Sequence, residues 1–164
     1  FFMMPVGTIG LALSTFVSQN KGANQRQRIR DGVKYGNLIA IGWGIVITVI
    51  LVIMAPFLVH LLSGSNEPTV IENGTLYLRI NAPFYAVLGI LLNLRNSLQG
   101  LGMKIIPLIS SVIECLGKVM FVALFIPVLG YFGVIICEPV IWCCMAIQLA
   151  WSFYHNPYIQ SLEN

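Results

Sequence analysis

The chain has 164 residues, of which 57% are hydrophobic and only 9% are charged, and its formal net charge is +3. A water-soluble domain carries about 25% charged residues, so this composition excludes a soluble globular protein. The net charge is also too small to indicate nucleic-acid binding.

Continuous apolar runs favour helices over a transmembrane barrel. In lipid the backbone must satisfy its own hydrogen bonds, which leaves helices or closed barrels, and barrel strands would alternate polar and apolar residues. The sequence therefore predicts an all-α membrane protein, a bundle of five transmembrane helices whose first helix is truncated. The predicted helices cover about residues 1–18, 38–62, 76–98, 105–128 and 132–154.

The first two segments differ in how clearly they indicate a membrane span. The first is short, begins without an initiator methionine, and is interpreted as a helix cut off upstream in a longer protein. The second contains no Asp, Glu, Lys or Arg, which makes it the clearest span. The remaining three are long enough to cross a bilayer of about 30 Å. The connector at 127–130 is so short that the fourth and fifth helices are expected to be antiparallel neighbours.

Basic residues alternate between the predicted loops. The loop at 19–35 holds five of the nine basic residues, the loop at 63–75 holds only acidic charges, and the next loop is basic again at Lys104. The positive-inside rule places the first and third loops and the tail at 155–164 in the cytoplasm. The topology and lipid-headgroup candidates are Lys21, Arg26, Arg28, Arg30 and Lys34.

Part of the first loop has helical spacing. Ile29 and Val33 are expected to face the membrane while the neighbouring basic side chains reach lipid headgroups. A nucleic-acid patch is disfavoured because no aromatic side chains accompany the charges.

Ionisable groups at bilayer depth are the main candidates for a substrate or ion pathway. Glu114 and Lys118 are four residues apart and share a helix face, either as an internal ion pair or as an ion-coupling site. Glu138 precedes Trp142 by one turn, a pairing that suits a cationic guest, although a carboxylate reaching toward the headgroups is favoured.

The third segment contributes the remaining candidates. Asn81 and Tyr85 share a face, and Asn93 lies near the cytoplasmic end. Hydrogen bonding between helices is favoured over cavity lining for the two asparagines. Arg95 is interpreted as an interfacial anchor. No catalytic motif or metal-ligand spacing is present, so neither an enzyme nor a cofactor is expected.

Three motifs resemble the multidrug and toxic compound extrusion (MATE) family. LSTFVSQNKGA (residues 13–23) and the basic stretch after it are similar to a helix end and amphipathic connector of that family. LRNSLQGLGMK (94–104) and VLGYFGV (128–134) are similar to two of its later connectors. Order and spacing agree over essentially the whole chain.

The resemblance implies a twelve-helix protein with two lobes, of which residues 1–164 would supply the eighth to twelfth helices, a partial C-terminal lobe. The missing N-terminal lobe of the same chain would be its partner. Such a transporter would export cationic or amphipathic drugs from a bacterium across the plasma membrane by sodium- or proton-coupled antiport with alternating access. Some members carry an acidic residue in the tenth helix. Here none lies between Arg79 and Arg95, so that ion site is not carried over.

Two rival interpretations remain. A flippase for lipid-linked oligosaccharides would need several cavity arginines or lysines, and only Arg79, Arg95 and Lys118 qualify. A structural membrane subunit would use Glu114 and Lys118 for assembly alone.

Overall fold

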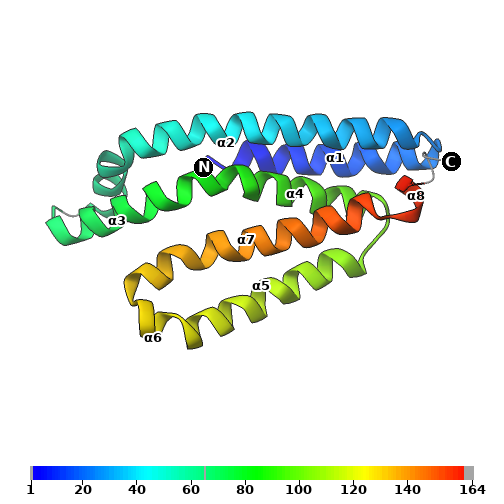
Figure 1. The fold of residues 1–164 in the computed structure, drawn as a ribbon. Helices are drawn as coiled ribbons and strands as arrows, with labels where there is room; N and C mark the ends of the chain where they lie inside the picture. The colour runs from blue at the N-terminus through cyan, green and yellow to red at the C-terminus, as the bar shows by residue number, and fades with distance from the viewer. Residues whose placement is uncertain (1, 65, 161–164) are drawn as a thin grey trace.

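The computed structural model describes residues 2–64 and 66–160, and its long elements are all helices (Figure 1). They are α1 (Met4–Gly22), α2 (Arg26–Ser63), α3 (Pro68–Asn81), the 3-10 turn η1 (Ala82–Phe84), α4 (Tyr85–Gly100), α5 (Ile105–Leu124), α6 (Ile126–Leu129), α7 (Tyr131–Tyr154) and α8 (Pro157–Gln160). Because α3 and α4 form one bent rod, the described chain contains five long rods. The predicted all-α bundle is confirmed.

The rods pack in two groups. Helices α1, α2 and α3–α4 contact one another, while α5 and α7 form an antiparallel pair that joins the first group mainly through α7 and α4 (Figure 1). The main core lies between α4, α7 and the α2 segment around Ile29 and Val33. Helix α5 is therefore the peripheral rod, held along one side.

Small residues allow the closest approach between helices. A Cβ atom on Gly44 of α2 would lie 2.6 Å from the Cα of Ala86 on α4, and one on Gly100 would lie 2.5 Å from the carbonyl oxygen of Ser14 on α1. Helices in membranes associate through such close packing because lipid provides no hydrophobic drive between them. These glycines therefore fix how α1, α2 and α4 pack together.

The rod formed by α3 and α4 bends where proline interrupts the helix. Pro83 lies within η1, and a proline ring removes one backbone donor and displaces the preceding turn. The single proton of the Thr48 hydroxyl on α2 is shared between the Gly44 carbonyl oxygen of its own helix, at 2.7 Å, and the Ala82 carbonyl oxygen at the bend, at 2.9 Å. This contact anchors the bend to α2.

The predicted loop at 19–35 is wrong over most of its length. Helix α1 continues to Gly22, α2 begins at Arg26, and a short turn between them contains Asn24 with φ of 54°. A prediction based on hydropathy ends a membrane span at the first charged residue. Helix α2 has 38 residues and is about 57 Å long, so it continues beyond a bilayer core of about 30 Å. Ile29 and Val33 are fully buried in the protein core, so the expectation that they face the membrane is also wrong.

Other boundaries shift for local reasons. Most of the expected loop at 63–75 is the start of α3, where Pro68 occupies the first turn and residues 68–75 are helical. The fourth helix ends at Leu124 and α6 follows with Pro127 in its first turn, so residues 125–128 do not continue α5. The fifth helix begins at Tyr131. In the first segment the helix begins at Met4, and Phe1 lies outside the described residues.

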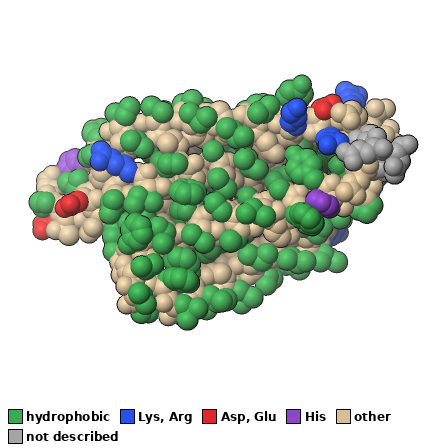
Figure 2. All heavy atoms as spheres, in the orientation of Figure 1, with side chains coloured by type: hydrophobic (Ala, Val, Ile, Leu, Met, Phe, Trp, Pro, Cys, Tyr) green, Lys and Arg blue, Asp and Glu red, His purple; other side chains and the backbone are tan. Residues whose placement is uncertain are grey.

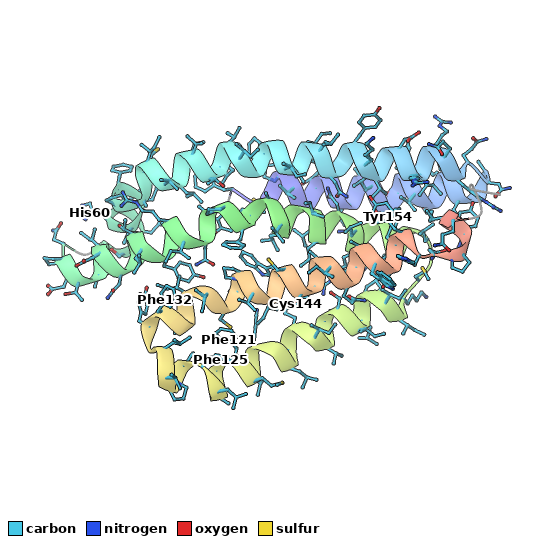
Figure 3. The ribbon with its side chains drawn as sticks, viewed as in Figure 1. His60, Phe121, Phe125, Phe132, Cys144 and Tyr154 are labelled. Atoms are coloured by element: carbon cyan, nitrogen blue, oxygen red, sulfur yellow. The ribbon has the colours of Figure 1, made fainter. Side chains whose placement is uncertain are left out.

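The surface fits a bilayer. Within the described residues, four stretches are long and apolar enough to cross a membrane, at 26–63, 68–100, 105–124 and 131–154. On the face drawn in Figure 2, Lys, Arg, Asp and Glu side chains gather toward the two ends of the molecule and hydrophobic side chains cover the middle. Phe121, Phe125 and Phe132 lie near the junction of α5 and α7, and Tyr154 lies toward the opposite end (Figure 3).

Candidate functional site

Four charged side chains from three helices form a continuous series, here named the charge chain (Arg95, Glu114, Lys118 and Glu138). The Arg95 guanidinium on α4 lies 3.8 Å from a carboxylate oxygen of Glu114 on α5. Lys118 lies 3.1 Å from Glu114, one turn away on the same helix, and 3.0 Å from Glu138 on α7. Lys118 is therefore shared between two carboxylates.

The charge chain lies at bilayer depth. Glu114 follows the first residue of α5 by nine positions, a rise of about 14 Å, which is close to half of the hydrocarbon thickness. Glu138 follows the first residue of α7 by seven positions, a rise of about 10 Å. Charged side chains at this depth are costly unless they are paired or hydrated. The charge chain pairs two cationic side chains with two anionic ones.

The side chains are only partly covered. The exposed fractions are 21% for Arg95, 33% for Glu114, 39% for Lys118 and 29% for Glu138. Arg95 also donates to the Ser111 hydroxyl at 3.0 Å. A proton or cation that reaches Glu138 can therefore compete with Lys118 for the carboxylate without unfolding the helices.

An aromatic pair lies one turn from Glu138. The rings of Trp142 on α7 and Tyr85 on α4 have centroids 6.0 Å apart and are tilted by 34°. Tyr85 also lines a cavity of about 190 Å³ with Leu51 and Leu58 of α2. The structure thus brings Tyr85 and Trp142 together between α4 and α7, while the Glu138 carboxylate, one turn before Trp142 on α7, reaches Lys118 on α5.

The two asparagines join helices outside the charge chain. The buried Asn81 amide donates to the Ile135 carbonyl oxygen of α7 at 3.1 Å. The buried Asn93 amide donates to the Gly36 carbonyl oxygen of α2 at 2.9 Å. Both contacts are hydrogen bonds between helices.

The predicted topology residues lie at one end of the bundle, together with the turn at 101–104 and helix α8. Lys21 donates to the Leu101 carbonyl oxygen at 2.6 Å, and Arg26 lies over the Tyr158 ring with 4.7 Å between the guanidinium carbon and the ring centroid. Arg28 and Lys34 are exposed, and Arg30 is half-buried. We call this the basic end. The last four residues of the tail, 161–164, lie outside the described residues.

Sequence reasoning missed the role of Arg95. The interpretation of Arg95 as an interfacial anchor stays a prediction, and its guanidinium in addition bonds to α5 within the bundle. The contact of Arg95 with α5 could have been predicted from the short turn at 101–104, which makes α4 and α5 antiparallel. In such a pair, residues equally distant from the turn lie at the same depth. Arg95 and Ser110 are one example, and the Arg95 guanidinium lies 3.4 Å from the Ser110 hydroxyl. Across residues 2–64 and 66–160, no three His, Cys, Asp or Glu side chains gather as a metal site would require.

Comparisons with known proteins give one consistent result. The MatE family model matches residues 1–135. The fold is similar to that of a solved structure described as an inward-facing multidrug resistance MATE family transporter of the MOP superfamily, with a TM-score of 0.77 over 96% of this chain. The two sequences are 14% identical, so the likeness concerns the fold, and this chain covers 38% of that transporter's length. No curated protein sequence matches the chain.

Proposed function

The chain belongs to the MatE family of membrane transporters, and we propose that it forms part of the translocation pathway of a secondary active exporter. The proposed cargo is a cationic or amphipathic compound, and the proposed driving force is the entry of sodium ions or protons. Its place as a partial C-terminal lobe, paired with an N-terminal lobe of the same chain, stays a prediction.

The observation that carries this proposal is the charge chain. Lys118 supplies a resident cation to Glu138, so an incoming proton or sodium ion would replace one cation contact with another. Because Lys118 stays on α5, binding of the incoming cation adds one positive charge to the previously neutral charge chain, and this uncompensated charge at bilayer depth would favour a conformation in which Lys118 is hydrated or paired elsewhere. Alternating access requires that the cation binds more tightly in one conformation than in the other, because a ligand shifts a conformational equilibrium only by its unequal affinity for the two states. Competition between the cation and Lys118 for Glu138 would provide this difference.

The position of α5 connects this exchange to movement. Helix α5 packs along α7 and has few contacts with α4, and the charge chain supplies side-chain links from α5 to both helices. Releasing Lys118 from Glu138 would loosen α5 against α7. The peripheral rod is therefore the proposed moving element.

The site chemistry supports a cationic cargo. Trp142 lies one turn from Glu138 on α7 and packs against Tyr85, and cations bind favourably to such aromatic faces. A flippase for large anionic substrates would be expected to carry an excess of cations, whereas the charge chain is neutral. The exporter is therefore favoured over the flippase.

The proposal is tested by transport in proteoliposomes. The protein is expressed from its complete reading frame, reconstituted, and assayed for export of a cationic dye under a proton or sodium gradient. Glu138→Gln should reduce gradient-dependent export at least tenfold, while the control Glu72→Gln, an exposed acidic residue of α3 outside the charge chain, should leave it unchanged. Equal export by both variants would remove Glu138 from the mechanism. No gradient-dependent export by the unaltered protein would favour a structural subunit.

We propose a multi-pass plasma-membrane protein with its basic end in the cytoplasm, on the positive-inside rule. In a variant whose four native cysteines are replaced by serine, a cysteine introduced at Arg28 should resist a membrane-impermeant thiol reagent in intact cells and react after permeabilisation. A cysteine introduced at Glu72 should react with the reagent in intact cells without permeabilisation.

A further inference from the structure

A pocket of about 300 Å³ lies between α4 and α5 near the basic end. Its walls come from the last turns of α4 and the first two turns of α5. They are formed by Arg95, Gln99, Lys104, Pro107, Leu108 and Ser111. The pocket lies outside the Lys118–Glu138 contact and shares only Arg95 with the charge chain.

The pocket presents positive charge from two helices. Arg95 reaches it from α4, and Lys104 stands at the start of α5. The Nε atom of Arg95 is buried and has no hydrogen-bond partner among the described residues. The first turn of α5 adds the partial positive charge of a helix N-terminus. Glu114 is the carboxylate paired with Arg95. The distance between the two groups, 3.8 Å, is the longest among the contacts of the charge chain.

The outer wall of the pocket continues into an apolar stripe. Ile105, Leu108 and Val112 share one face of α5 and are 71%, 63% and 48% exposed. These residues are exposed on the described chain, as expected for a helix face that contacts acyl chains. From Lys104 toward Val112 the surface thus changes from cationic to apolar over about 12 Å, which resembles the passage from headgroup to acyl region in a lipid leaflet.

We propose that this pocket binds the phosphate headgroup of an anionic phospholipid, with the acyl chains lying along Ile105, Leu108 and Val112. Basic pockets between transmembrane helices on the positively charged side are suited to anionic headgroups. The Gln99 amide can donate a further hydrogen bond to a phosphate oxygen, and the Ser111 hydroxyl could do so only by giving up its bond to the Pro107 carbonyl oxygen. The bound phosphate would share Arg95 with Glu114, so an anionic lipid would weaken the contact between Arg95 and Glu114 in the charge chain. This proposal stands independently of the transported cargo.

Native mass spectrometry of the complete protein in detergent tests the proposal. Phosphatidylglycerol and phosphatidylcholine with identical acyl chains are added in parallel, and inorganic phosphate is added in a third arm. We expect one tightly retained phosphatidylglycerol. Lys104→Gln should weaken its retention about fivefold, the effect of one basic residue near an anionic headgroup. Lys34→Gln removes the same charge from an exposed position of α2 at the same end and should have no effect.

Each alternative result contradicts the proposal. Equal losses in Lys104→Gln and Lys34→Gln would show diffuse attraction to the basic end instead of a site. Equal retention of the two lipids would show binding through acyl chains alone. Full displacement of phosphatidylglycerol by millimolar inorganic phosphate would identify a site for a free anion. A Leu108→Asn variant provides a second readout, since it should release phosphatidylglycerol while leaving the two cations in place.

Discussion

The Nζ atom of Lys118 on α5 lies 3.0 Å from a carboxylate oxygen of Glu138 on α7. The two residues are 20 positions apart and meet because α5 and α7 are antiparallel. Lys118 is the link between the Glu114 carboxylate on its own helix and the Glu138 carboxylate across the interface.

Replacing Lys118 by Met should destabilise the protein, because two carboxylates at bilayer depth then face each other without their shared cation. We expect a loss of about 1 kcal/mol, at the upper end of the range for exposed pairs and below that for buried pairs. The double variant Lys118→Met/Glu138→Gln should recover part of that loss. Thermal unfolding in detergent measures both. If the double variant unfolds at a temperature no higher than that of the single one, the charges are not coupled.

Gly44→Leu should disrupt the contact between α2 and α4, since even a Cβ at this position lies 2.6 Å from the Ala86 backbone. Overpacking of this kind costs about 1–3 kcal/mol. The matched control is Gly42→Leu, two residues away, where no atom lies within 4 Å of the added Cβ. The melting temperature should fall for the first variant and stay near that of the unaltered protein for the second. Leucine is the better helix former of the two residues, so helix propensity cannot lower either melting temperature, and similar falls in both variants would mean that the contact with Ala86 is not the cause.

Asn93→Ala should weaken the attachment of α4 to α2 by removing the donor to the Gly36 carbonyl oxygen. Hydrogen bonds between membrane helices contribute about 0.6 kcal/mol on average, so the expected loss is below about 1.7 kcal/mol. Asn73→Ala, at an exposed position of α3, serves as the control. Comparable denaturant midpoints for both variants would contradict this role of Asn93.

Lys21→Met should loosen the turn between α4 and α5, because the Lys21 ammonium donates to the Leu101 carbonyl oxygen at 2.6 Å. Hydrogen exchange at residues 101–104 should become faster, while exchange in the middle of α4 stays slow. Lys34→Met removes an equivalent charge from α2 without touching this turn. Unchanged exchange at 101–104 in Lys21→Met would show that the bond does not hold the turn.

The number and type of long helices could be predicted from composition, because an apolar run of this length has no other stable form in lipid. The pairing of Glu114 with Lys118 also followed from helical spacing, since residues four apart share a face. The boundary errors arose where a helix continues past the membrane: the charges of residues 26–34 lower hydropathy but do not end α2.

The sequence by itself determined that the chain crosses a bilayer, that most of its charges lie outside the apolar spans, and that Glu114 and Lys118 share a face. Only the tertiary structure decided that Arg95 meets Glu114, that Lys118 meets Glu138, and that Ile29 and Val33 face inward. The physical reason is that lipid and protein core are both apolar. Hydrophobicity therefore does not specify how a transmembrane helix is rotated about its axis, and close contacts such as that of Gly44 with Ala86 set the rotation instead.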